Sequence, residues 1–539
     1  MSPLIHGSKK ISLDQDKTVF DYADDLKIRV PTSCGRTGEC HECIVEIKQG
    51  VDGLTHRTEP EKFLKDRYRL ACQAKISDPS TNLEFSVLRR QPKILTTSIK
   101  RKIIADPITR KIDNFVCYGE RKLEEYKGSI FGLAIDIGTT TVAMNLVDLE
   151  KYVTIYTASF ENPQKFGGSD VMNRISYDGG PHHGELRKVI LSSINFEIGD
   201  MCRKLNLHRR RIYEVVLVGN STMRDIVFGV DVQSIGEKPY KSKIEQEFIE
   251  GKRKSTALNI LAEDLGIRIF PKANIYGGPL IASHVGSDVS ADLLAIGMDE
   301  MTENVMLVDI GTNTEVIIGN RDRILAASCP AGPAFEGGEI KFGMAGYEGA
   351  VEAVKMSNDS VEIETIGDID PEGICGSGLI DLLAELRRTE KMNELGIFKN
   401  GEQEFTFASK QELTLSRADI SALAQAKSAN YCGQWIVLRE FGQPIRDLAK
   451  FYLAGGFANY INEENAIEIG FLADVNLENI EKAGNASLEG ATIMLMSGKL
   501  RSRIEDLVLK VEHIELETTD DFFDLFVEGC QFKRMNFKL

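Results

Sequence analysis

The most regular feature of the chain is a pair of apolar stretches, each interrupted by a short polar turn. Residues 133–149 form an apolar run that stops at Gly138, continues through three threonines and resumes as a second apolar run. This pattern predicts two strands joined in a β-hairpin. Residues 306–319 repeat the design, with the break at Gly311. The sequence therefore predicts two similar hairpins, separated by about the length of a domain.

The turns of both hairpins have the composition of a phosphate site. Glycine and hydroxyl residues at a turn expose backbone N–H groups and hydroxyls, which are the donors that a polyphosphate requires. Asp136 and Asp309 precede the two turns, where a carboxylate can orient a magnesium ion or its water. One hairpin is weak evidence, whereas two suggest a duplicated fold that closes on one nucleotide. The residues predicted to hold phosphates are Gly138, Thr139, Thr140, Thr141, Gly311, Thr312 and Asn313.

These two Asp-Ile-Gly-Thr hairpins resemble those of the actin-like ATPase superfamily, which includes acetate kinase, sugar kinases, heat-shock chaperones and actin. The resemblance implies a duplicated, ribonuclease-H-like fold that holds ATP and Mg²⁺ between its halves. In that superfamily a strand that ends in paired glycines approaches the adenine and ribose. Here the apolar run 451–454 ends in Gly455 and Gly456, so we expect the nucleoside beside them.

Polar residues at the ends of two further elements are candidates for the same cleft. The apolar strand predicted over residues 215–218 is followed by Asn220, Ser221 and Thr222. Residues at such strand ends usually face the ligand crevice of an α/β fold, although simple capping of the next helix by Ser221 is an equal alternative. Asp288 opens an amphipathic helix, either as its cap or as a ligand of magnesium-bound water.

Three later segments complete the expected body. The loop 328–338 is rich in proline and glycine and is a candidate for partner contact through Ser328 and Phe335, with burial of Phe335 in the core as the alternative. Residues 487–527 predict helix, helix, strand and helix. A glycine turn starts another helix, whose positive N-terminal end favours an anionic group. Close packing of this helix against a neighbouring element explains the glycines equally well. The turn residues are Gly376, Ser377 and Gly378.

The N-terminal region predicts a small α+β module that contains clustered cysteines. Strands are expected over residues 10–13, 43–47 and 83–87, and a helix over residues 19–26. The cysteines follow a C-x5-C-x2-C spacing, with a distant fourth residue that can close the far side of a [2Fe-2S] cluster. Structural zinc is the alternative, but four-cysteine zinc sites usually consist of two close pairs. The predicted ligands are Cys34, Cys40, Cys43 and Cys72.

The module resembles ferredoxins of the β-grasp fold, with a spacing closer to the adrenodoxin-like than to the plant type. His41 lies inside the cluster loop, and with four cysteines available we expect it to be a solvated histidine and not a ligand. The other six cysteines are scattered singly and are expected to be unreactive thiols.

Composition and charge indicate which kinds of binding partner are unfavourable for this chain. The hydrophobic content of 42% is typical of a globular protein, and the net charge of −16 disfavours nucleic acid. No apolar run approaches the length of a membrane span, and the first residues lack a signal-peptide core, so we expect a cytoplasmic protein without a membrane partner. Residues 91–128 carry nine Lys or Arg against five Asp or Glu, which predicts a tether or a small connecting domain between module and body.

The series of motifs over nearly the whole chain resembles the reductive activators of corrinoid proteins. These motifs include the two hairpins, Gly219-Asn-Ser-Thr-Met223, the loop that begins at Cys329 and Gly373-Ile-Cys-Gly-Ser-Gly378. The resemblance implies ATP-dependent transfer of one electron from the [2Fe-2S] cluster, which returns cob(II)alamin in a partner protein to cob(I)alamin. It also implies a low-potential electron donor and a homodimer. The residues expected to be catalytic are Asp136, Asp309, Glu315 and Glu336.

The expected fold class is therefore multidomain, α/β with α+β. A ferredoxin-like domain occupies residues 1–90, a linker 91–128, a middle domain 129–208 and the actin-like ATPase domain 209–539. Two other functions use the same motifs: a small-molecule kinase of the acetate and sugar kinase superfamily, and a redox-sensing ATPase module that binds partners without delivering electrons.

Overall fold

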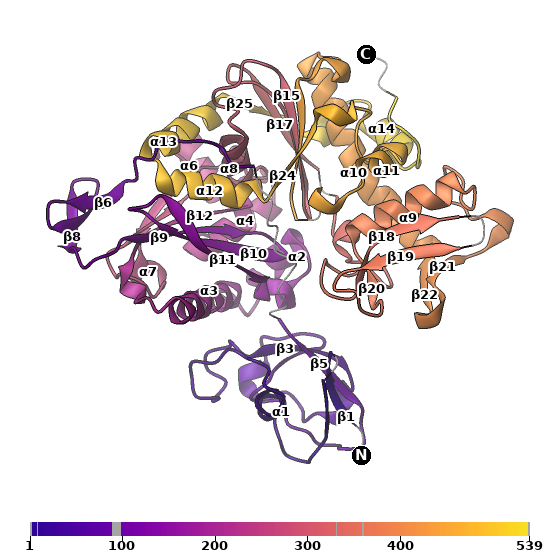
Figure 1. Ribbon diagram of the computed structural model, residues 1–539, viewed down its shortest axis with the longest axis horizontal. Coiled ribbons are helices and arrows are strands. Elements are labelled where there is room, and N and C mark those ends of the chain that lie inside the picture. Colours follow the sequence, from indigo (N-terminus) through magenta and orange to yellow (C-terminus); the bar gives the residue numbers. More distant parts are fainter. Residues whose placement is uncertain are drawn as a thin grey trace.

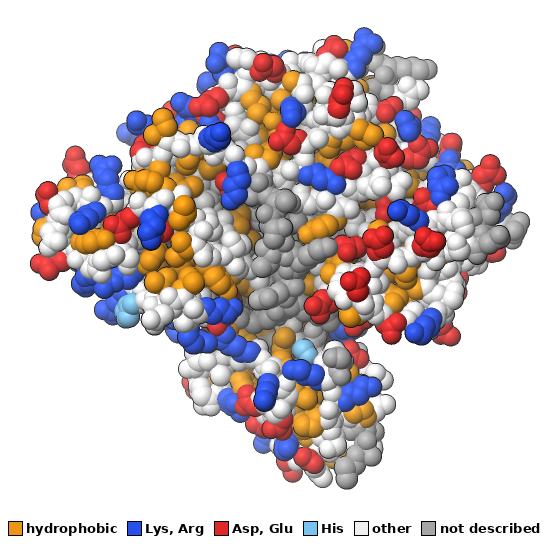
Figure 2. Space-filling view, in the orientation of Figure 1, with side chains coloured by type: hydrophobic (Ala, Val, Ile, Leu, Met, Phe, Trp, Pro, Cys, Tyr) orange, Lys and Arg blue, Asp and Glu red, His pale blue; other side chains and the backbone are white. Residues whose placement is uncertain are grey.

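The computed structural model forms a small N-terminal module and a larger body. Figure 1 shows the module as a separate lobe next to the first half of the body, and acidic and basic side chains are intermixed over the face in Figure 2. Within the described part of the chain, no helix is both long enough and apolar enough to cross a bilayer. The structure describes residues 3–7, 9–88, 99–329, 331–357, 360–456 and 458–536.

The N-terminal module is a five-stranded mixed sheet with one helix, which is the β-grasp fold expected from the sequence. The strand order is β2-β1-β5-β3-β4, with β1 and β5 parallel at the centre. Thr18 and Asp21 close the start of α1 in a capping box, which satisfies N–H groups that the first turn leaves unpaired. The elements are β1 (Pro3–His6), β2 (Lys9–Ser12), α1 (Val19–Asp25), β3 (Ile44–Gln49), β4 (Tyr68–Leu70) and β5 (Leu83–Val87).

Residues 99–128 of the expected linker form a small connecting domain that is fixed to the body. The guanidinium of Arg101 lies 2.6 Å from the carboxylate of Asp299, and Val116 is buried in the core of the body. Residues 91–98 of the same segment lie outside the described residues. The antiparallel sheet consists of β6 (Thr109–Ile112), β7 (Phe115–Tyr118) and β8 (Arg121–Glu125).

The first half of the body is a six-stranded sheet in the order β11-β10-β9-β12-β14-β13. β9 and β10 form the first predicted hairpin, and β12 runs parallel to β9, which brings Gly219 beside Ile137 at the hairpin tip. Because β12 and β14 share this sheet with β9, the domain boundary expected after residue 208 falls within one sheet. The sequence did not indicate this shared sheet, because parallel pairing between distant segments leaves no local pattern.

The elements of this half are β9 (Phe131–Ile137), β10 (Thr141–Asp148), β11 (Val153–Glu161), α2 (Val171–Asp178), α3 (Glu185–Lys204), β12 (Ile212–Gly219), α4 (Ser221–Phe228), α5 (Gln233–Gly236), α6 (Lys243–Ile249), β13 (Leu258–Leu261), α7 (Ala262–Leu265), β14 (Asn274–Gly277) and α8 (Ser287–Ile296).

The second half repeats this topology. Its sheet has the order β24-β23-β15-β16-β17-β25, in which β17-β16-β15-β23 corresponds to β11-β10-β9-β12. β23 is parallel to β15 and places Ala454 beside Asp309, so Gly455 emerges at the tip of the second hairpin. The duplication predicted from the two hairpins is confirmed.

The remaining strands of the second half are β15 (Val305–Ile310), β16 (Thr314–Gly319), β17 (Ile324–Cys329), β18 (Ala350–Met356), β19 (Val361–Thr365), β20 (Gly373–Ile374), β21 (Glu404–Ala408), β22 (Leu413–Ser416), β23 (Lys450–Ala454) and β24 (Ile480–Gly484), and its helices before the C-terminal segment are α9 (Gly376–Arg388), α10 (Arg417–Phe441) and α11 (Glu463–Glu468).

The C-terminal segment crosses back to the first half of the body. Its predicted order of helix, helix, strand and helix is confirmed. A Cβ atom at Gly490 of the first of these helices would lie 2.0 Å from the carbonyl oxygen of Ala291 in α8, so glycine allows the two helices to touch. The elements are α12 (Ala486–Met496), α13 (Gly498–Leu507), β25 (Val511–His513) and α14 (Phe522–Gly529).

Candidate functional site

The two hairpin tips face one cavity of about 250 Å³ between the halves of the body. Each tip is closed by a backbone hydrogen bond, from Gly138 to the carbonyl oxygen of Thr141 at 3.0 Å and from Gly311 to that of Asn313 at 2.9 Å. The glycine turn at the start of α9 and the paired glycines after β23 complete the wall. Predicted residues that line the cavity are Asp136, Gly138, Thr139, Thr140, Thr141, Asn220, Asp309, Gly311, Thr312, Asn313, Glu315, Glu336, Gly376, Ser377, Gly455 and Gly456.

Carboxylates from both halves are concentrated at one end of this cavity. Asp136, Asp288 and Asp309 line it, and Asp292 is buried next to them. Burial and the neighbouring carboxylates raise the pKa of Asp136 to about 8 and that of Asp288 to about 7. Several carboxylates this close together can all be ionised only when a bound cation neutralises their charge. Carboxylate oxygens are ligands that suit Mg²⁺. The donor set therefore fits a hydrated magnesium ion held by one or two of these carboxylates.

The carboxylate of Glu336 connects the two phosphate hairpins. It lies in the short helix η5 (Ala334–Glu336) after β17. The hydroxyl of Thr140 donates to it at 3.1 Å, and the hydroxyl of Thr312 in the other half donates to the same oxygen. Burial raises the pKa of Glu336, partly offset by these hydrogen bonds. This carboxylate therefore lies between the two turns that the sequence predicts to bind phosphate.

Replacing Glu336 by Gln tests whether this carboxylate acts as a base. We expect kcat for ATP hydrolysis to fall by about 100-fold, with less change in KM, because glutamine keeps the shape but cannot accept a proton. A base must be ionised to act, and burial raises the pKa of Glu336. As the pH is lowered, wild-type turnover should therefore begin to fall at a pH above the ordinary pKa of a carboxyl group. Glu339→Gln, at an exposed residue directly after the loop 328–338, is the control. An unchanged kcat in Glu336→Gln would contradict the role.

The four clustered cysteines of the N-terminal module lie in two pairs. The thiol of Cys43 donates to the sulfur of Cys72 at 3.3 Å, which lowers the pKa of Cys72 and raises that of Cys43. Cys34 and Cys40 form the second pair. Although burial opposes ionisation, hydrogen bonds from Thr37 and Cys40 lower the pKa of Cys34 to about 5.

This donor set fits a cluster with two irons, each held by one cysteine pair. Among the described residues, no three His, Cys, Asp or Glu side chains converge on a point that a single metal ion could occupy. His41, expected to be solvated, is largely buried: its ring stacks on Phe63 and its Nδ1 lies 2.6 Å from the carboxylate of Glu185 in α3. That expectation was wrong because the module packs against the body at this loop.

Family models match the chain in three successive parts. Residues 5–77 match a 2Fe-2S iron-sulfur cluster binding domain, residues 131–301 the RACo middle region, and residues 303–539 the C-terminal domain of RACo, described as the ASKHA domain. The chain belongs to the RACo family. Its site thus combines the iron-sulfur domain and the nucleotide-binding ASKHA domain of that family.

Relatives of this RACo family member match most or nearly all of its length. RamQ of Eubacterium limosum, a corrinoid activation enzyme, is 26% identical over 97% of this chain and 98% of its own length. A Methanosarcina barkeri protein, named as a reductase of the Co(II) methylated amine-specific corrinoid protein, is 22% identical over 74% of this chain and 76% of its own. A solved reductive activator for corrinoid, iron-sulfur protein has a TM-score of 0.72 and 27% identity, covering 99% of each chain.

Some residues predicted to line the cleft have a structural role instead of, or in addition to, that one. Asn220 caps α4 and also donates to the hydroxyl of Thr139 at 3.0 Å, whereas Ser221 and Thr222 are buried behind it. Gly378 does not line the cavity. A Cβ atom there would lie 2.3 Å from the carbonyl oxygen of Val351, so close packing is its role.

The loop 328–338 also differs from its expected role as a partner contact. Phe335 is buried, with its ring centroid 4.9 Å from that of Phe471, which is the core-lining alternative. Ser328 donates to the carboxylate of Glu315 at 3.1 Å inside the site. The described part of this loop, residues 331–338, includes Glu336, which lies between the hairpins.

Sequence reasoning did not identify Asn485, which comes from the C-terminal segment. Its side-chain amide donates to the carboxylate of Asp136 at 3.0 Å, while its oxygen caps α12. An asparagine before a helix is a capping signal, but nothing local indicates that this helix returns to the first hairpin. Asp292 lies in α8, one turn after Asp288, and was missed because nothing local indicates that this face of the helix meets Asp309.

Proposed function

We propose that this chain is an ATP-dependent reductase that activates a corrinoid protein, returning its cofactor from cob(II)alamin to cob(I)alamin by one electron. The observation that carries the proposal is the combination of a two-iron cysteine site and a duplicated nucleotide cleft in one chain. Full-length similarity to corrinoid activators supports it. The cluster, when bound to Cys34, Cys40, Cys43 and Cys72, supplies one-electron chemistry.

In this proposal the residues of the cleft hold and orient ATP. The hairpin tips bind the phosphates, Asp136 and Asp309 support Mg²⁺, and Gly455 and Gly456 lie at the nucleoside. The N-terminus of α9, at Gly376 and Ser377, adds backbone N–H groups near the anion. Glu336 would accept a proton from the attacking water, and Glu315 would help to hold a hydrated Mg²⁺ ion.

ATP is needed because reduction to the cob(I) state is uphill for ordinary cellular donors. Every 59 mV is about tenfold in a one-electron equilibrium, so a modest change in the partner's cobalt ligation has a large effect. Closure of the two halves on ATP and reopening after hydrolysis give the chain two conformations that can bind the partner differently. We also propose a low-potential electron donor and a homodimer, both from the family resemblance.

The test mixes the purified chain, a corrinoid protein, a reductant and ATP without oxygen, and follows the optical conversion of cob(II)alamin to cob(I)alamin. We expect conversion only with ATP. Equal conversion without ATP would contradict the proposal. Transfer of phosphate to a small acceptor would instead indicate a kinase, and ATP turnover without electron delivery would indicate a redox-sensing module.

A further inference from the structure

One short segment of the body contacts both the ferredoxin module and the first phosphate hairpin. It begins at Asn162, continues through the short helix η3 (Pro163–Gly167) and ends in α2 at Tyr177. Most of its side chains that face the ferredoxin module or the hairpin are buried. The site described above uses none of these residues.

At its first end, this coupling segment, residues 162–177, holds the hairpin tip. The backbone N–H of Asn162 donates to the carbonyl oxygen of Thr140 at 2.7 Å, and its side-chain amide donates to that of Gly138 at 2.8 Å. Asn162 is 0% exposed. Both bonds fix carbonyl groups of the turn, and so fix the direction in which the N–H groups of the phosphate clamp point.

At its other end, the coupling segment forms the docking surface for the ferredoxin module. The ring of Phe166 meets Phe63 of the module edge to face, with centroids 5.4 Å apart, and meets Tyr177 in the same way at 5.5 Å. The hydroxyl of Tyr177 donates to the backbone oxygen of Phe63. Phe63 in turn stacks on His41 in the cysteine loop, with centroids 4.1 Å apart.

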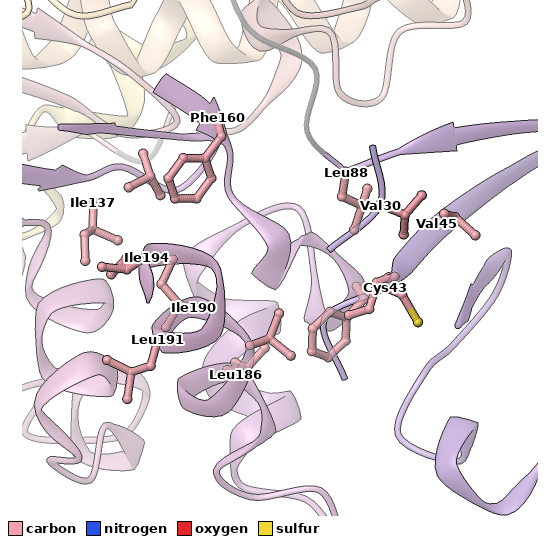
Figure 3. Close-up of a cluster of buried hydrophobic side chains, with 14 of the residues drawn as sticks. Val30, Cys43, Val45, Leu88, Ile137, Phe160, Leu186, Ile190, Leu191 and Ile194 are labelled. Atoms are coloured by element: carbon pink, nitrogen blue, oxygen red, sulfur yellow. The ribbon is translucent and has the colours of Figure 1, made fainter. Parts of the chain in front are cut away.

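The two ends are joined by rigid contacts. Phe166 lies in η3, four residues after Asn162, which caps the start of that helix. Arg174 of α2 contacts the sulfur of Met223 at 3.2 Å, and the side-chain amide of Asn162 approaches the same sulfur. Gly168 has a φ of +149° and lies against Asn173, so the bend into α2 admits no other side chain without a shift. Figure 3 shows side chains of the same core, from Cys43 and Val30 of the module to Leu186 and Phe160 of the body.

We propose that residues 162–177 couple docking of the ferredoxin module to the phosphate clamp, with Asn162 as a positioning residue for ATP. This inference rests on the proposed function of the cleft as an ATP site. Docking holds the segment in place, the segment holds the hairpin tip, and a preformed tip binds phosphate more tightly. Coupling between two sites is reciprocal, so ATP must strengthen docking by the same factor.

The primary test uses the whole chain and hydrogen–deuterium exchange with and without a non-hydrolysable ATP analogue. Bound analogue should protect the hairpins and also slow exchange about fivefold in the peptides around residues 40–43 and 61–66. Protected hairpins with unchanged exchange in those two peptides would overturn the coupling alone. Unprotected hairpins would overturn the nucleotide site and the coupling together, so the two failures are distinguishable.

A variant pair tests the reverse direction. Tyr177→Phe removes the hydroxyl that donates to Phe63 and should weaken binding of the analogue about fivefold, although Tyr177 does not line the cavity. Met172→Ala on the exposed face of the same helix should leave binding unchanged, since Met172 is 53% exposed. In an Asn162→Ala background, Tyr177→Phe should have no further effect. Equal binding by Tyr177→Phe and wild type, or an additive effect in the double variant, would overturn the proposal.

Discussion

Replacing Asp136 by Ala should abolish ATP hydrolysis while leaving the visible spectrum of the cluster unchanged. Asp136 lines the cavity directly before the first phosphate turn and is held by Asn485. If this carboxylate supports Mg²⁺, its loss removes several kcal/mol of charge stabilisation at the phosphates, and each 1.4 kcal/mol is about tenfold in rate. We therefore expect a decrease of at least about 100-fold in kcat, measured by phosphate release at saturating ATP.

The cluster should survive this change because the ferredoxin module has its own sheet and helix. Asp322→Ala, at an exposed turn of the second half, is the matched control and should hydrolyse ATP normally. Asp136→Asn separates charge from shape and should be nearly as inactive as Asp136→Ala. Turnover within about threefold of wild type in either Asp136 variant would count against the metal-binding role of this hairpin.

Replacing Cys72 by Ala should remove the [2Fe-2S] spectrum and, with it, corrinoid reduction. Cys72 is the distant member of the pair with Cys43, and alanine has no atom that can bind iron. We expect iron content and visible absorption per chain to fall at least about tenfold in protein purified without oxygen. ATP hydrolysis in the absence of a corrinoid protein should persist, since the cleft lies in the other part of the chain.

Cys530→Ala is the control for this experiment, because Cys530 is a free thiol in the C-terminal segment, away from the cysteine loop. It should keep the cluster and full corrinoid reduction. A Cys72→Ala protein with an unaltered cluster spectrum would show that the ligand set is wrong. Zinc in place of iron in a metal analysis of the wild-type protein would contradict the [2Fe-2S] assignment itself.

The sequence by itself determined the parts of this protein that depend on near neighbours. Alternation between apolar strands and a Gly-Thr turn defined both hairpins, because a strand and its turn are specified within about ten residues. Cysteine spacing indicated the cluster loop for the same reason. The repetition of one hairpin was enough to predict the duplicated sheets, and the paired glycines after β23 indicated where that strand ends in the cavity.

Tertiary structure alone decided how distant segments complete the site. Asn485 reaches Asp136 because α12 packs on α8, and Glu336 lies between the hairpins because Phe335 is buried against Phe471. The ferredoxin module meets the body through Phe63 and Phe166. Each of these contacts joins residues far apart in the chain, and their positions follow from the shapes of packed side chains on several elements at once. No local pattern of hydrophobic and polar residues encodes such a fit, because it depends on how whole elements pack together.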